Sequence, residues 1–81
     1  MPHFHLHIST DGHEDHDGDG HEFNDLRHAI AAAGKSAGEL LYDILRESPR
    51  STMLTVRVCA TDGTEHAVIT AECRLADATV T

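Results

Sequence analysis

The feature that most constrains the fold is an Asp-Gly dipeptide between two segments of alternating polar and apolar residues. Asp62-Gly63 separates residues 52–60 from residues 65–73, and this arrangement is the strongest short-range signal for a β-hairpin. A two-residue turn at the dipeptide also fixes the strand register. That register pairs Val58 with Ala67, Val56 with Ile69 and Leu54 with Ala71 on one face, and Cys59 with His66, Arg57 with Val68 and Thr55 with Thr70 on the other. Because the first face is entirely apolar, turn chemistry and hydrophobic pattern agree on one antiparallel hairpin.

A helix is predicted over residues 24–47. Asn24 offers an N-cap, and Asp25 lies in the first turn, where the helix dipole favours an acid. Ser48-Pro49 ends the helix, because the residue before a proline avoids helical angles. Apolar residues recur at spacings of three and four, as in an amphipathic helix; they are Leu26, Ile30, Ala33, Ala37, Leu40, Leu41 and Ile44.

Two glycines interrupt this helix, at Gly34 and Gly38. Each costs up to about 1 kcal/mol relative to alanine inside a helix. Lying four residues apart, they make the helix thin and would let another backbone approach closely. We interpret them as the place where the helix packs on the protein's own sheet, and a helix–helix dimer seam is the alternative.

The N-terminal part completes one small α+β domain over residues 1–81. Residues 3–8 alternate strictly and predict a strand over residues 1–8, whose apolar side chains face the core while His3, His5 and His7 face away. Residues 9–22 are rich in His, Asp and Gly and predict a loop or hairpin, with a short strand around residues 21–23. Residues 75–81 predict a frayed tail. The expected fold is one amphipathic helix on a three- or four-stranded, mostly antiparallel sheet, in the order β-(β)-α-β-β.

The formal charge of −8 is concentrated at one end of the 81-residue chain. Residues 1–25 contain seven of the fourteen acids, six of the eight histidines and no Lys or Arg. The remainder is nearly neutral, with seven acids and six bases. A net acidic chain excludes a duplex-binding surface over the whole molecule, which needs the opposite sign. We therefore expect no direct contact with nucleic acid.

Catalysis and membrane insertion are not expected. The chain contains no nucleophile elbow, phosphate-binding loop or zinc-protease pattern. No apolar stretch approaches the roughly 20 residues that span a bilayer, and no secretory signal is visible at the N-terminus. Cys59 and Cys73 lie too far apart in the predicted register for a disulfide. Two free thiols favour a reducing compartment, so we expect a cytoplasmic protein without a cofactor.

The charge asymmetry predicts an interaction protein. Carboxylates on a hairpin beside a neutral body can dock on a basic groove of the kind that nucleic-acid-handling proteins offer, and so compete with nucleic acid. The expected contacts to such a protein partner are Asp15, Asp17, Asp19 and Glu22, with Arg57 and Val68 at the edge of the exposed sheet face. The alternative is that this run of charges only keeps the protein soluble and binds no partner. A structural homodimer without another partner is a further alternative.

Divalent-metal binding is the principal alternative function. Alternate residues of a strand share a face, so two neighbouring imidazoles of His3, His5 and His7 could hold zinc, nickel or copper. The three together could not, because the ends of the strand segment are about 13 Å apart. The remaining ligands would come from His13, His16, His21 or a carboxylate. Nothing in the sequence forms a fixed-spacing ligand signature.

The chain resembles a domain-of-unknown-function family of short bacterial proteins. The likeness rests on Met1-Pro2, on Phe4, on Asp11-Gly12 and on Asp17-x-x-Gly20-x-Glu22-x-x-Asp25-Leu26 ahead of an Ala-rich helix. It implies this fold and a cytoplasmic bacterial origin, and no activity. The layout is similar, more distantly, to HicB-type antitoxins, which bind a partner. Small acidic inhibitors of CRISPR effectors are comparable in size and charge alone.

Overall fold

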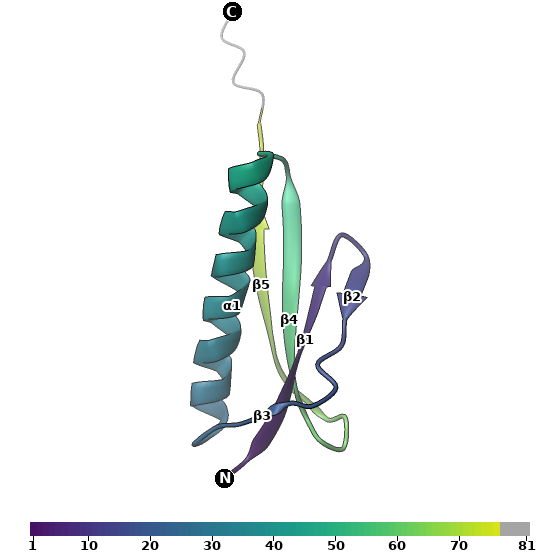
Figure 1. Cartoon of the computed structure of the whole chain (residues 1–81), viewed down its shortest axis with the longest axis vertical. Coiled ribbons are helices and arrows are strands. Elements are labelled where there is room, and N and C mark those ends of the chain that lie inside the picture. The colour runs from purple at the N-terminus through teal and green to yellow at the C-terminus, as the bar shows by residue number, and fades with distance from the viewer. Residues whose placement is uncertain (77–81) are drawn as a thin grey trace, which may run out of the picture.

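A computed structural model describes residues 1–76 as one helix and five strands (Figure 1). In chain order the elements are β1 (His3–Thr10), β2 (His13–Asp15), β3 (His21–Glu22), α1 (Leu26–Glu47), β4 (Thr52–Ala60) and β5 (Glu65–Cys73). The order is therefore β-β-β-α-β-β. The predicted α+β class is confirmed, and the strand that the sequence did not indicate is β2. Residues 77–81 of the predicted frayed tail lie outside the described part.

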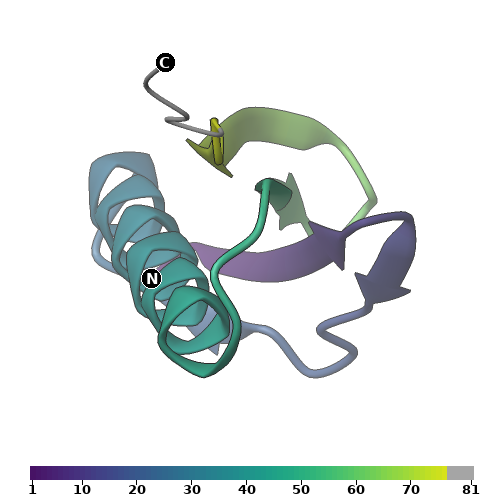
Figure 2. The ribbon, with the colours of Figure 1, turned by 90° about the horizontal axis from the view of Figure 1, so that it is seen from above.

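All strand pairs are antiparallel, and β1 and β4 occupy the centre of the sheet. The strand order is β2-β1-β4-β5, and β3 pairs with the same edge of β1 as β2 does. The helix packs against β4 and β5 on one face (Figures 1 and 2). Across the centre of the sheet His5 lies opposite Cys59 and His7 opposite Arg57. The opposite face of the sheet therefore carries the histidines of β1, as predicted.

The β4–β5 hairpin has the predicted register except beside the turn. Five of the six predicted pairs are present, and Cys59 faces Glu65 instead of His66. Gly63 takes a φ of +91°, and its N–H donates to the carbonyl of Ala60, so the turn is longer than the two residues expected. A bulge between Val58 and Cys59 restores the register. It leaves His66 unpaired beside the ring of Phe4, at 5.8 Å between centroids.

A second hairpin joins β1 to β2, within the residues predicted to form a loop or hairpin. Thr10 pairs with His13 across Asp11-Gly12, whose φ angles are +49° and +84°. Two successive residues with positive φ form the hairpin turn that Asp-Gly favours. β1 therefore continues to Thr10 rather than ending at residue 8, and residues 13–15 pair with it as β2.

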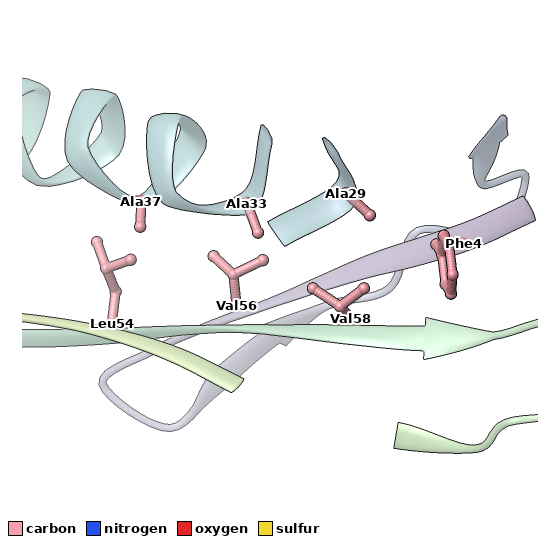
Figure 3. Close-up of a cluster of buried hydrophobic side chains, with 7 residues drawn as sticks. All are labelled: Phe4, Ala29, Ala33, Ala37, Leu54, Val56 and Val58. Atoms are coloured by element: carbon pink, nitrogen blue, oxygen red, sulfur yellow. The ribbon is translucent and has the colours of Figure 1, made fainter. Parts of the chain in front are cut away.

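The core lies between α1 and the central strands. Phe4, Leu54, Val56 and Val58 from the sheet meet three alanines of the helix in Figure 3. Those alanines are Ala29, Ala33 and Ala37, all with no exposed surface. Small side chains on this line bring the helix close to the sheet, because interaxial distance depends on side-chain size. The predicted stripe is wrong at Ile30, which is 36% exposed; Ala29 takes the buried position.

The N-cap of the helix lies one residue later than predicted. Asp25, not Asn24, is the cap, and its Oδ1 accepts the backbone N–H of His28 at 3.0 Å and a ring nitrogen of His28 at 2.7 Å. These bonds lower the pKa of Asp25. Ser48 closes the helix at its C-terminus, as expected before Pro49. Within residues 1–76, this helix lacks the apolar length needed to cross a membrane.

The two glycines of α1 do not contact the sheet. A Cβ atom added at Gly34 or Gly38 would meet no atom within 4 Å. Both positions lie beside the buried alanine line rather than on it, next to open space. The expectation that they bring the helix onto the protein's own sheet is therefore wrong, because alanines rather than glycines occupy that interface.

Candidate functional site

The histidines of β1 and the acidic residues meet along one edge of the sheet. We call residues 13–22 the acidic segment; it comprises β2, the connection through residues 16–20, and β3. His3 donates from Nε2 to the carbonyl of Asp19 at 2.8 Å, and His5 donates from Nδ1 to the carbonyl of Asp17 at 2.7 Å. The imidazoles therefore hold the backbone of the acidic segment beside β1, and we call this set of contacts the histidine clasp.

His7 completes the histidine clasp with the opposite polarity. Its Nδ1 accepts the backbone N–H of Asp17 at 3.1 Å, so this nitrogen carries no proton and the neutral ring is protonated at Nε2. Burial, followed by the nearby charges of Arg57, His16 and His5, lowers the pKa of His7, while Glu14 opposes the shift. Burial and each of the nearby positive charges disfavour a cationic ring. The environment thus favours the neutral form that the hydrogen bond requires.

The carboxylate of Asp17 fills a gap at the edge of β1. β2 pairs with Ile8–Thr10 and β3 pairs with His3–Phe4, which leaves the middle of that edge without a strand. Asp17 Oδ2 accepts the N–H of Leu6 at 3.1 Å, and its Oδ1 accepts the N–H of Gly20 at 3.0 Å. Burial acts to raise the pKa of Asp17, but these backbone donors outweigh it and the pKa is lowered. Asp17 is therefore a structural member of this edge.

The acidic segment passes close to β1 at Gly20. Its φ is +71°, which favours glycine. A Cβ atom there would lie 2.7 Å from His3 Nε2, 2.9 Å from His5 Cε1 and 2.9 Å from the carbonyl oxygen of Phe4. A larger residue would have to displace backbone as well as imidazole. Gly20 thus lets the segment pass directly over the histidine clasp.

The predicted partner contacts divide into two groups. Asp15, Asp19 and Glu22 are exposed, and the side chain of Asp15 is 76% accessible beside His13. Val68 is 49% exposed on β5, in the face opposite the helix. These four side chains are free to meet a partner. Asp17 is occupied by backbone donors, and Arg57 by acids.

Arg57 links the sheet to the acidic segment. One guanidinium nitrogen lies 2.9 Å from Glu14 and another lies 3.9 Å from Glu65. Glu14 also lies 3.0 Å from His16. Partly exposed pairs of this kind contribute little to stability, but they extend the charged surface across β2, β4 and β5. The sequence assigned no role to Glu14 and marked Gly20 only as a position of the family motif, because the roles of both residues depend on contacts across the chain.

The histidines do not converge on a metal site. Within residues 1–76, no three of the His, Cys, Asp and Glu side chains are placed to hold one ion. Successive rings along β1 lie 5.4 Å and 6.0 Å apart between centroids. One nitrogen of each of His3, His5 and His7 is engaged with backbone. The geometry therefore gives the zinc, nickel or copper hypothesis no support. Both cysteines are free thiols, Cys59 buried and Cys73 half-buried.

Comparison with known proteins identifies a family and no activity. A family model described as "Domain of unknown function (DUF6894)" matches residues 3–72. The chain belongs to this family. No curated protein and no solved structure matches the chain. The predicted family likeness is thus confirmed for a DUF6894 domain, while the likeness to antitoxins and CRISPR inhibitors stays a prediction. The match covers the histidine clasp, the acidic segment, the β1–β2 hairpin and the β4–β5 hairpin up to Glu72.

Proposed function

We propose that this DUF6894 domain is a non-catalytic interaction module whose acidic segment docks on a basic groove of a protein partner. One observation carries the proposal: the exposed carboxylates of Asp15, Asp19 and Glu22 project from a backbone that the histidine clasp holds in place. A charged loop that is already ordered loses less conformational entropy on binding than a disordered one. The clasp therefore supports recognition as well as solubility.

Charge distribution supports a basic partner. Residues 1–25 contain no Lys or Arg, and the rest of the chain is close to neutral. An acidic patch on a neutral body orients the approach of a positively charged surface and speeds association at low salt. Val68 adds an exposed apolar contact on the face of the sheet that Arg57 joins to the segment.

The test compares capture by three forms of the domain. The first is wild type, and the second carries Asp15→Asn, Asp19→Asn and Glu22→Gln, which remove three charges without touching Asp17. The third removes three exposed acids elsewhere, through Asp43→Asn, Glu47→Gln and Glu72→Gln. Each is immobilised, incubated with lysate of the cells that encode the protein, and analysed by quantitative mass spectrometry at low and high salt.

We expect a basic protein that wild type and the third form retain and that the second form loses. Its capture should also fall steeply with salt, because exposed charges are screened. Equal capture by the second and third forms would contradict the proposal, since net charge would then suffice. Capture that resists salt would contradict the electrostatic mode of binding. Unchanged thermal unfolding of the second form shows that lost capture is not lost folding.

A further inference from the structure

One exposed strip of α1 carries two glycines and a tyrosine and packs against no other element among residues 1–76. Gly34, Gly38 and Tyr42 follow one another at intervals of four and lie on one side of the helix. They line an open groove of about 450 Å³ together with Lys35, Glu39 and Asp43. Tyr42 is 63% exposed, and Ile30 beside this line is 36% exposed. The groove is large enough to admit side chains from another helix.

No contact within residues 1–76 requires a glycine at position 34 or 38. Neither adopts a positive φ, and neither lies within 4 Å of atoms that a Cβ would meet. Glycine is nonetheless among the poorest residues for a helix interior. Two glycines four apart make a shallow strip along which another helix can approach closely, because interaxial distance follows side-chain size at the contact. Their placement indicates an interface with something outside the chain.

The two charged residues beside the glycines can pair with the same two residues of a second copy. Lys35 and Glu39 lie four apart on the same flank of the groove, and within residues 1–76 neither forms an ion pair. A second copy can be related to the first by a two-fold axis that is perpendicular to both helices and level with residue 37. This axis keeps the flank that carries Lys35 and Glu39 on the same side of the pair in both copies. It therefore places Lys35 of each copy opposite Glu39 of the other, giving two ion pairs.

We infer that this face of α1 binds a second copy of the chain in antiparallel orientation. The axis at residue 37 brings Tyr42 of each copy level with Ala32 of the other, so each ring lies over Ala31 and Gly34 of the opposite helix. A parallel pair, related by a two-fold axis along the helices, would put the flanks that carry Lys35 and Glu39 on opposite sides of the seam, so neither residue could pair with the other copy's. The acidic segments stay free, because they lie on the edge of β1 rather than on this face.

Charge reversal tests the orientation and the partner together. We expect wild type to dimerise in sedimentation equilibrium. Lys35→Glu and Glu39→Lys should each weaken self-association on the order of tenfold, because each turns two attractive pairs into two repulsive ones. An equimolar mixture of the two variants should form a heterodimer, since one chain then presents two acids and the other two bases. The double variant Lys35→Glu/Glu39→Lys should dimerise as wild type does.

Gly38→Leu tests the close approach independently of charge. A Cβ at Gly38 meets nothing within the chain, so the monomer folds, while the leucine fills the groove and abolishes dimerisation. Helix content by circular dichroism confirms that each variant is folded. Three results would overturn the inference. They are a wild type that stays monomeric at its solubility limit, single variants that dimerise unchanged, and a mixture that forms no heterodimer.

Discussion

The helix-facing side of the sheet and the acidic segment are held by different physical interactions. Leu54, Val56 and Val58 are fully buried under the alanines of α1, so hydrophobic burial stabilises that side. The acidic segment has no buried apolar side chain of its own, and imidazole nitrogens and the carboxylate of Asp17 hold its backbone. Stabilisation by apolar burial depends little on pH, whereas stabilisation by hydrogen bonds to titratable groups varies with pH. One domain thus combines a constant scaffold with a surface that responds to solution conditions.

The largest expected effect is on the scaffold. Leu54→Ala removes a fully buried side chain and should lower the free energy of unfolding by about 2–5 kcal/mol, through lost burial and the cavity left behind. Urea denaturation measures the change. Met53→Ala is the control, because Met53 is the neighbouring residue and is 54% exposed; it should change stability by less than about 0.5 kcal/mol. Equal losses in both variants would show that the helix-facing core does not carry the fold.

Asp17→Ala should detach the acidic segment without unfolding the scaffold. It leaves the N–H groups of Leu6 and Gly20 without acceptors, a loss of about 1–2 kcal/mol, because the site is only partly buried. Amide hydrogen exchange should accelerate at those two residues and stay slow at Val56. Asp19→Ala is the control, since only the backbone carbonyl of Asp19 is used in the histidine clasp. Slow exchange at Leu6 and Gly20 in Asp17→Ala would contradict the role given to this carboxylate.

Gly38→Ala should raise the stability of the scaffold by up to about 1 kcal/mol. The added methyl group meets nothing within the chain, and alanine is the better helix former. Thermal unfolding is measured in the Lys35→Glu form, in which self-association is weakened, so that the change reflects the stability of the monomer. Gly63→Ala should have the opposite sign, because φ is +91° at that turn. A destabilised Gly38→Ala would mean that the glycine is required within the single chain.

The smallest effect is an acid-dependent loosening of the acidic segment. The pKa of His7 is lowered from 6.5 in the folded chain, so below pH 6.5 the unfolded chain binds the proton more readily. The contribution of neutral His7 is therefore complete above pH 6.5 and is lost as the pH falls through the lowered value. Hydrogen-exchange protection of the Asp17 amide should fall as the pH drops below 6.5, while that of Val56 stays constant.

His7→Gln separates the ring from other acid effects. A glutamine oxygen can accept the same N–H at any pH, so protection at Asp17 should lose its dependence on acidity over this range. His13→Gln is the control, because His13 is exposed and its ring lies beside Asp15 rather than the backbone of the segment. A wild type whose protection at Asp17 stays unchanged would contradict the assignment of Nδ1 as an acceptor.

Local patterns predicted most of the scaffold. The β4–β5 register followed from Asp-Gly and strict alternation, and it failed only where the turn added a residue and His66 became unpaired. The same dipeptide at Asp11-Gly12 was also a hairpin signal, but His13-Glu14-Asp15 has no apolar residue to mark a strand. In the helix, Ile30 and Ala29 were both compatible with the stripe. Periodicity alone could not show that small residues occupy the interface.

The candidate site was predicted in composition but not in arrangement. Sequence alone located the acids and the histidines in the first 25 residues. The pairing of His5 with the backbone of Asp17, twelve residues away, depends on the path of the chain and on rotamers. No short motif encodes such a contact. The division between a structural Asp17 and an exposed Asp19 could therefore emerge only from the folded molecule.

Gly20 has a consequence for how such a surface can diversify. A side chain at this position would clash with backbone and imidazole atoms of β1. Asp17 is constrained as well, because its carboxylate accepts the backbone N–H groups of Leu6 and Gly20. The side chains of Asp15 and Asp19 are exposed and hold no part of the backbone in place. Substitution at these two positions can therefore change the charge of the surface while the chain around them keeps the same course.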